Sequence, residues 1–144
     1  MRVSRSKYEI HVHLVWWTMR GQPMLDGGRL MIALRSVTEH AGELGCDVIA
    51  VGGVEDHIHA LIKLPGTLSV SGLVKQIKGA SSHCLNLADR AAPLSRARFR
   101  WQHGFGAFSI SRSHIPKVAD YIRNQEAHHA SGNLYPNLEE SEDD

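Results

Sequence analysis

Cysteine is scarce in this sequence, with two residues in a chain of 144. Cys46 and Cys84 are too few for a disulfide framework, and they lack the close pairing that is typical of a zinc site. We therefore expect a reduced protein of the cytoplasm.

Long apolar runs are absent as well. No segment approaches the roughly 20 apolar residues of a membrane-spanning helix, and the first residues lack the cleavage region of a signal peptide. No internal repeat or low-complexity segment is present. A hydrophobic share of 42% and a charged share of 22% predict one soluble globular domain with a real core and no membrane partner.

The net charge of +1 conceals an uneven distribution. The final residues hold five of the fifteen acidic side chains: Glu139, Glu140, Glu142, Asp143 and Asp144. We expect residues 131–144 to form an acidic, flexible tail behind a domain of residues 1–130. Between residues 75 and 123, nine basic residues stand against two acidic ones. This surplus favours a polyanionic partner, although an ordinary solvated surface would also explain it.

Hydrophobic periodicity predicts the secondary structure. Strands are expected over residues 8–18, 47–53, 57–64 and 101–111. Helices are expected over 28–44, over 69–88, and from 113 or 116 to about 129, with a basic loop over 91–100. The order β-α-β-β-α-β-α predicts an α+β, ferredoxin-like split βαβ fold. It is an antiparallel sheet with helices on one face, followed by a C-terminal helix that carries a tyrosine.

Two histidines interrupt the apolar strand predicted over residues 57–64. Side chains alternate along a strand, so His57 and His59 point to the same face while Ile58 points to the other. Two neutral imidazoles at this spacing can bind one metal ion. The alternative is a pair of ordinary polar residues on a solvated face.

The last predicted helix offers a second group of reactive side chains. Tyr121 and Gln125 are four residues apart and hence neighbours on one side of the helix. Val118 and Ile122 form a different, apolar stripe that can pack the helix onto the body. A half-buried core tyrosine is the alternative to a nucleophile.

Five segments resemble, in this order, the single-tyrosine HUH transposases of small bacterial insertion sequences (the IS200-like transposase family), close to the branch of REP-associated tyrosine transposases. The segments are YEIHVHLVWWT, VGGVEDHIHALIKLP, SVSGLVKQIKGASS, FRWQHGFGAFSIS and VADYIRNQEAHH. The resemblance covers about residues 8–130. It implies that His57, His59 and Gln125 bind a divalent cation, Mg²⁺ or Mn²⁺, and that Tyr121 is the nucleophile.

The resemblance also implies an activity. The expected enzyme cleaves and rejoins single-stranded DNA through a 5′-phosphotyrosine intermediate, acts on hairpin-bearing element ends, and forms a homodimer. In that dimer, we expect the tyrosine helix of one chain to complete the site of its partner. Two alternatives remain: a domesticated, non-catalytic protein that binds single-stranded nucleic acid, and a metal-dependent nuclease that uses water in place of tyrosine.

Candidate DNA contacts are basic residues of the second helix, the following loop and the last connection. They are Lys75, Lys78, Arg96, Arg98, Arg100 and Arg112.

His11 and His13 form a second histidine pair, which we interpret as structural or near the site. Trp16 and Trp17 point to opposite faces of their strand, so one is expected in the core and the other at an interface or against a base.

Overall fold

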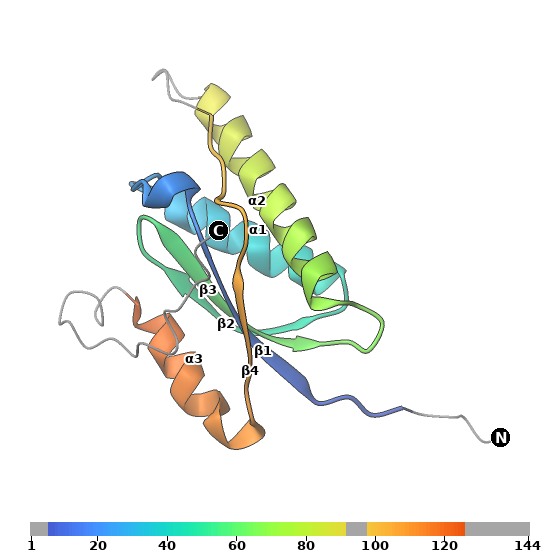
Figure 1. Ribbon diagram of the computed structural model, residues 1–144. Helices are drawn as coiled ribbons and strands as arrows, with labels where there is room; N and C mark the ends of the chain where they lie inside the picture. The colour runs from blue at the N-terminus through green and yellow to red at the C-terminus, as the bar shows by residue number, and fades with distance from the viewer. Residues whose placement is uncertain (1–5, 92–97, 126–144) are drawn as a thin grey trace.

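The structure, a computed structural model, describes residues 6–91 and 98–125 (Figure 1). The predicted tail, residues 131–144, lies outside the described residues, and so does Arg96. Within the described parts of the chain, no helix is long and apolar enough to cross a membrane.

Four strands form one sheet: β1 (Ile10–Trp17), β2 (Asp47–Gly53), β3 (His57–Leu64) and β4 (Gly106–Ser109). Their spatial order is β2-β3-β1-β4, and every neighbouring pair is antiparallel. Strand β3 therefore lies between β1 and β2, as a split βαβ arrangement requires. The predicted ferredoxin-like α+β fold is confirmed.

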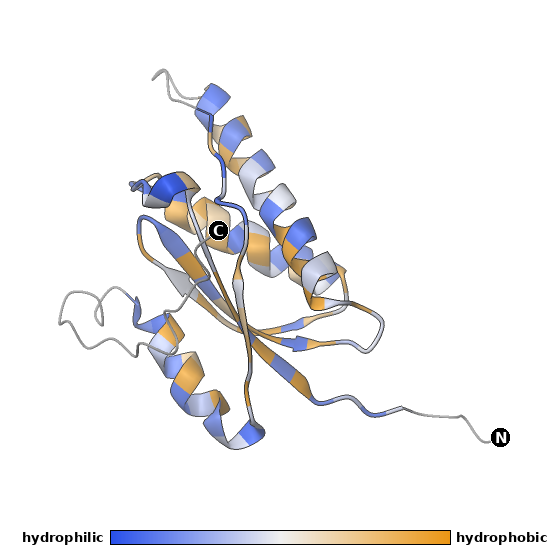
Figure 2. Ribbon diagram, viewed as in Figure 1, coloured by the Kyte–Doolittle hydropathy of each residue, from blue (hydrophilic) through white to orange (hydrophobic). Residues whose placement is uncertain are grey.

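Two helices, α1 (Arg29–Glu43) and α2 (Val70–Ala91), cover one face of this sheet (Figure 1). The even-numbered residues of β1 and β3 point toward them and form the main core with residues such as Val37, Leu73 and Ile77. Figure 2 shows apolar and polar residues interspersed along the helices, as expected for elements that bury one side.

The third helix, α3 (Ile115–Arg123), lies on the opposite face (Figure 1). It forms a second, smaller apolar cluster with Ala50 of β2 and Leu61 on the odd-numbered side of β3; the residues of α3 in this cluster are Val118, Ala119, Tyr121 and Ile122. The sequence predicted this helix but did not indicate which face of the sheet it covers. Its position means that both faces of the sheet are covered.

The last strand is shorter than predicted. β4 spans Gly106–Ser109 and not residues 101–111. Trp101 makes only an isolated bridge to Thr18, and its indole nitrogen donates to the Ser81 hydroxyl at 3.0 Å. Gly104 follows with a positive φ of 87°. The hydrogen bond of Trp101 to α2 and the left-handed backbone conformation of Gly104 prevent this segment from continuing as an extended strand.

Helix ends agree with the predictions to within a few residues. Helix α3 begins at Ile115 after a 3₁₀ turn at Arg112–His114, and it ends at Arg123. Most of the predicted continuation to residue 129 lies outside the described residues. The loop predicted over 91–100 contains a core residue, because Phe99 is buried and its backbone bonds the Asn86 side chain.

Candidate metal and tyrosine site

The two histidines of β3 are buried, not solvated. His57 is 4% exposed and His59 is fully buried, and both lie on the face that α3 covers. Their ring centroids are 5.1 Å apart. The alternative of ordinary polar residues on a solvated face is therefore wrong, because water does not reach these side chains.

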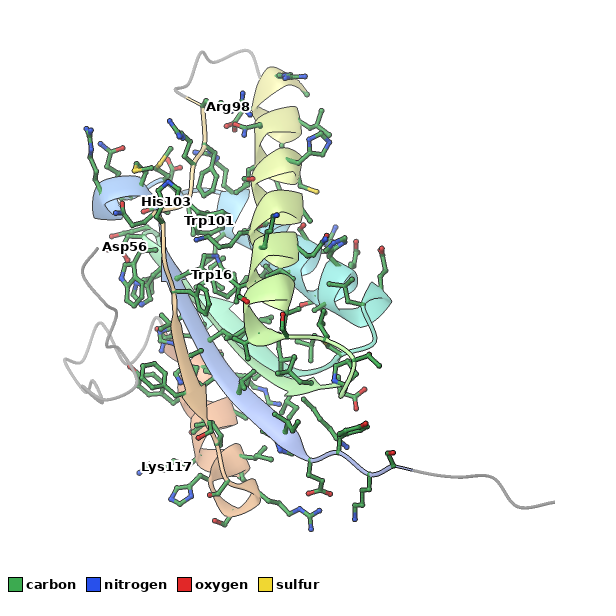
Figure 3. All side chains as sticks on the ribbon, turned by 45° about the vertical axis from the view of Figure 1, so that its right-hand side comes forward. Trp16, Asp56, Arg98, Trp101, His103 and Lys117 are labelled. Carbon is green, nitrogen blue, oxygen red and sulfur yellow. The ribbon has the colours of Figure 1, made fainter. Side chains whose placement is uncertain are left out.

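Each histidine is held through the same ring nitrogen. The Nδ1 atom of His57 lies 2.7 Å from Oδ1 of Asp56, and Nδ1 of His59 lies 2.8 Å from Nε2 of His13. Trp17 stacks on the His57 ring, with centroids 5.5 Å apart. With Nδ1 engaged in both rings, Nε2 is the nitrogen that would coordinate a cation. Asp56 stands at the end of the sheet, near the loop that carries His103 (Figure 3).

Tyr121 of α3 reaches the histidines from the covering helix. Its ring is 1% exposed and meets the His59 ring edge-on, with centroids 5.9 Å apart and an interplanar angle of 89°. The same ring belongs to the second apolar cluster, together with Val118 and Ile122. Tyr121 is thus both a packed residue of that cluster and a neighbour of His59 in the same chain.

Gln125 follows Tyr121 by one helical turn, and it is 2% exposed. Its amide nitrogen donates to the Tyr121 carbonyl oxygen at 3.4 Å, whereas its Oε1 has no hydrogen-bond partner among the described residues. A buried amide oxygen without a partner is costly. This cost would be relieved by a cation, so the side chain fits the role of a ligand.

The candidate donors are therefore two imidazoles and an amide oxygen. The described residues contain no group of three or more His, Cys, Asp or Glu side chains that could hold a metal. Among the described residues, a third protein ligand would therefore be of another type, and Gln125 is the candidate predicted from the sequence. Imidazole nitrogen and amide oxygen are ordinary ligands of divalent ions.

A glycine that the sequence reasoning did not single out allows α3 to approach this site. Gly52 of β2 is paired with His59 of β3. A Cβ atom at Gly52 would lie 2.0 Å from the carbonyl oxygen of Ile122 in α3. Only a residue without a side chain permits this contact between helix and sheet.

Those predicted DNA contacts that lie among the described residues are not gathered around the site. Lys75 is exposed on α2, which covers the other face of the sheet. Lys78 donates to the carbonyl oxygens of Gln102 and Gly104, at 2.7 and 3.1 Å. Arg98 and Arg100 are exposed on the segment that follows α2 in sequence, and Figure 3 labels Arg98 near the end of that helix.

Arg112 is engaged at the far end of the sheet from Asp56. Its guanidinium forms an ion pair and hydrogen bond with the Glu9 carboxylate, which lies just before β1. The hydrogen bond from Arg112 lowers the pKa of Glu9. The pair ties the connection before α3 to the beginning of β1.

Solved structures share this fold. One is the crystal structure of a Deinococcus radiodurans protein assigned as a transposase, with a TM-score of 0.66 and 22% identity, covering 87% of this chain and 98% of that one. Another is a REP-associated tyrosine transposase bound to a REP hairpin, with a TM-score of 0.62 and 16% identity, covering 99% and 93%. At these identities, the likeness establishes the fold.

The sequence establishes the family. The pattern described as "Transposase IS200 like" matches residues 6–125, so this chain belongs to that family of transposases. The ISDra2 transposase TnpA of Deinococcus radiodurans is 24% identical over 125 residues, which are 82% of this chain and 85% of the relative. The transposase for insertion sequence element IS200 of Salmonella typhimurium is 34% identical over 73 residues, 49% of this chain and 46% of that protein.

Proposed function

We propose that this transposase is metal-dependent and that it cleaves and rejoins single-stranded DNA through a 5′-phosphotyrosine intermediate. The observation that carries the proposal is the contact of Tyr121 with His59, whose ring centroids are 5.9 Å apart. A hydroxyl nucleophile and a pair of imidazoles thereby share one buried face of the sheet. Phosphoryl transfer depends chiefly on such positioning and on stabilisation of charge.

His57, His59 and Gln125 would hold the cation. By ligand type, two nitrogens and one oxygen suit Mn²⁺ somewhat better than Mg²⁺, which prefers oxygen. The buried, unpartnered Oε1 of Gln125 supports this assignment. When bound, a divalent ion stabilises negative charge at the scissile phosphate and fixes its orientation.

The chain itself supplies the nucleophile. The Tyr121 oxygen forms a bond to phosphorus as the bond from phosphorus to the 3′ oxygen breaks. The phenolic proton is lost and the departing 3′ oxygen gains one. One phosphoester replaces another, so a free 3′ hydroxyl can reverse the step and rejoin a strand without ATP. An ordinary tyrosine has a pKa near 10, which is why the acceptor must be activated.

The proposed substrate is single-stranded DNA with hairpins at the element ends. The structural relative with a bound REP hairpin supports this choice. The basic surplus between residues 75 and 123 supports a polyanionic partner such as a nucleic acid.

The test of the nucleophile is a covalent adduct on a denaturing gel. A labelled, hairpin-bearing single strand should become attached to the wild type but not to Tyr121→Phe, since only the hydroxyl is removed and the ring still packs. Tyr8→Phe is the matched control, because Tyr8 is 47% exposed and lies outside the site. An adduct that survives Tyr121→Phe would contradict the assignment.

The same gel separates the alternative functions. Cleavage without attached protein would indicate a nuclease that uses water, whereas an uncut strand that is retarded on a parallel native gel would indicate a non-catalytic single-strand binder. His57→Ala/His59→Ala should lose cleavage and metal dependence together, because one amide cannot hold the ion. Cleavage by this variant in metal-free buffer would refute the metal site.

We further propose a homodimer in which each site is assembled from a single chain. From sequence, assembly in trans was expected, but the contact of Tyr121 with His59 of its own chain supports assembly in cis. Mixing a His57→Ala/His59→Ala subunit with a Tyr121→Phe subunit tests this. In cis, both sites lack a part and no cleavage returns. Recovered cleavage from subunits shown to exchange would establish assembly in trans.

A further inference from the structure

His13 lies beside the site without belonging to the proposed ligand set. It is fully buried in β1, on the same face of the sheet as His59. Its Nε2 atom is 2.8 Å from Nδ1 of His59. The two rings are nearly parallel and meet edge to edge, with centroids 5.0 Å apart and an interplanar angle of 21°. This is a direct hydrogen bond between two buried imidazoles.

The bond restricts where the protons lie. A neutral imidazole has one N–H donor and one acceptor nitrogen. For Nε2 of His59 to bind a cation it must carry a lone pair, so the proton of that ring must be on Nδ1. The Nδ1–H group then donates to Nε2 of His13, and the His13 proton must be on its own Nδ1.

We propose that His13 is a positioning residue that holds His59 in its Nδ1–H tautomer and fixes the orientation of the ring. The inference rests on the proposed function, because it concerns a ligand of the proposed metal site. Outer partners of this kind set both the tautomer and the basicity of a ligating histidine.

His57 is also held through its Nδ1 atom, but its acceptor is a carboxylate and not a second imidazole. Asp56 accepts from Nδ1 of His57 at 2.7 Å. Its carboxylate is partly exposed, with a side-chain exposure of 39%. The acceptor for the more deeply buried His59 is a neutral ring supplied by β1. Each of the two proposed histidine ligands therefore has one acceptor for its Nδ1–H group, and each acceptor comes from outside β3.

The first test needs neither metal nor DNA. Nitrogen chemical shifts of the histidine side chains, measured by NMR on the metal-free wild type, report which ring nitrogen of His59 is protonated. We expect Nδ1–H in the wild type and a shift toward Nε2–H in His13→Phe, which keeps a ring but removes the acceptor. Nε2–H in the wild type would overturn the inference, whatever the protein binds.

The second test measures Mn²⁺ affinity by calorimetry. His13→Phe should bind Mn²⁺ about 10- to 100-fold more weakly, the usual effect of losing an outer partner. His13→Gln should recover part of the affinity, because its amide oxygen can accept from Nδ1. His11→Phe is the matched control, on the same strand and face but with no described hydrogen bond to either metal-site histidine.

The outcomes separate this inference from the proposed function. Undiminished Mn²⁺ affinity in a folded His13→Phe would overturn the role of His13 and leave the metal site intact. An equal loss in His11→Phe would do the same, since it would indicate a general effect of packing. A wild type that binds no Mn²⁺ would refute the metal site, and the tautomer measurement alone would then decide whether His13 fixes His59.

Discussion

Replacing Gly52 by alanine should separate α3 from the histidines without touching any reactive group. The new Cβ would lie 2.0 Å from the carbonyl oxygen of Ile122 and 3.0 Å from its carbonyl carbon. Both atoms belong to the backbone of α3, so no side-chain rotation relieves the overlap. Gly52 is not among the glycines with positive φ. The clash alone therefore carries the effect.

The size of the effect follows from this distance. Real Cβ contacts are essentially never shorter than 3.0 Å, so α3 must retreat by about 1 Å from β2. Overpacking of this kind costs about 1–3 kcal/mol of folding free energy. A displacement of about 1 Å at a reacting group can lower the rate by about 100-fold. Because Tyr121 is on α3 and Gly52 is paired with His59, the displacement acts directly between them.

Two measurements check this reasoning. Thermal unfolding should show a melting temperature lowered by roughly 3–10 °C, and adduct formation on single-stranded DNA should fall by about 100-fold. Gly79→Ala is the matched control: Gly79 is an exposed helical glycine with nothing within 4 Å of the added carbon, so stability should be unchanged or rise by up to about 1 kcal/mol. Wild-type activity in Gly52→Ala would refute the proposed closeness of α3 to the sheet.

Three further predictions concern the rest of the molecule. Asp89→Ala should destabilise the fold by about 2 kcal/mol in urea titrations, because the buried Arg29 loses its 2.8 Å partner and keeps the Met24 carbonyl and Asp26; an unchanged midpoint would contradict this. In DNA-binding titrations, Lys75→Ala should reduce the salt slope by about 0.7, whereas Lys78→Ala should leave it unchanged because its ammonium is held by backbone carbonyls. Burial raises the pKa of the Cys46 thiol, so less thiolate forms at neutral pH, and alkylation followed by mass spectrometry should be far slower in the folded than in the unfolded chain.

Most of the fold could be predicted from local pattern. The bounds of β2 and β3 match the prediction, because apolar alternation and the turns beside them define both ends. The order of elements was sufficient for the split βαβ topology. The last strand was harder to predict, because Trp101 is held by Ser81 on α2 and that contact is not visible in local alternation.

The face that α3 covers could not be predicted. Its stripe of Val118 and Ile122 indicated that the helix packs on the body, but both faces of the sheet offer apolar residues. The choice depends on Gly52, where the absence of a side chain admits the helix backbone. A glycine in a strand signals close approach in general, but it does not identify which element approaches.

The reactive residues of the candidate site could be predicted from the sequence, but their hydrogen-bond partners could not. His57, His59, Tyr121 and Gln125 were indicated by spacing and resemblance, and all four are buried residues in the structure. Asp56 and His13 were not recognised as partners of the histidines. His13 is 46 residues from His59 along the chain, so their bond depends on the pairing of β1 with β3.

The alternation of β3 explains how an apolar strand can carry two histidines. Its even-numbered residues, Ile58, Ala60 and Ile62, belong to the main core under α1 and α2, whereas His57 and His59 face α3. One strand thus contributes to the core with one face and to the site with the other. Because the main core does not include the histidines, His57→Ala/His59→Ala should keep the sheet and the two large helices folded. Loss of cleavage in that variant can therefore be assigned to the site and not to unfolding.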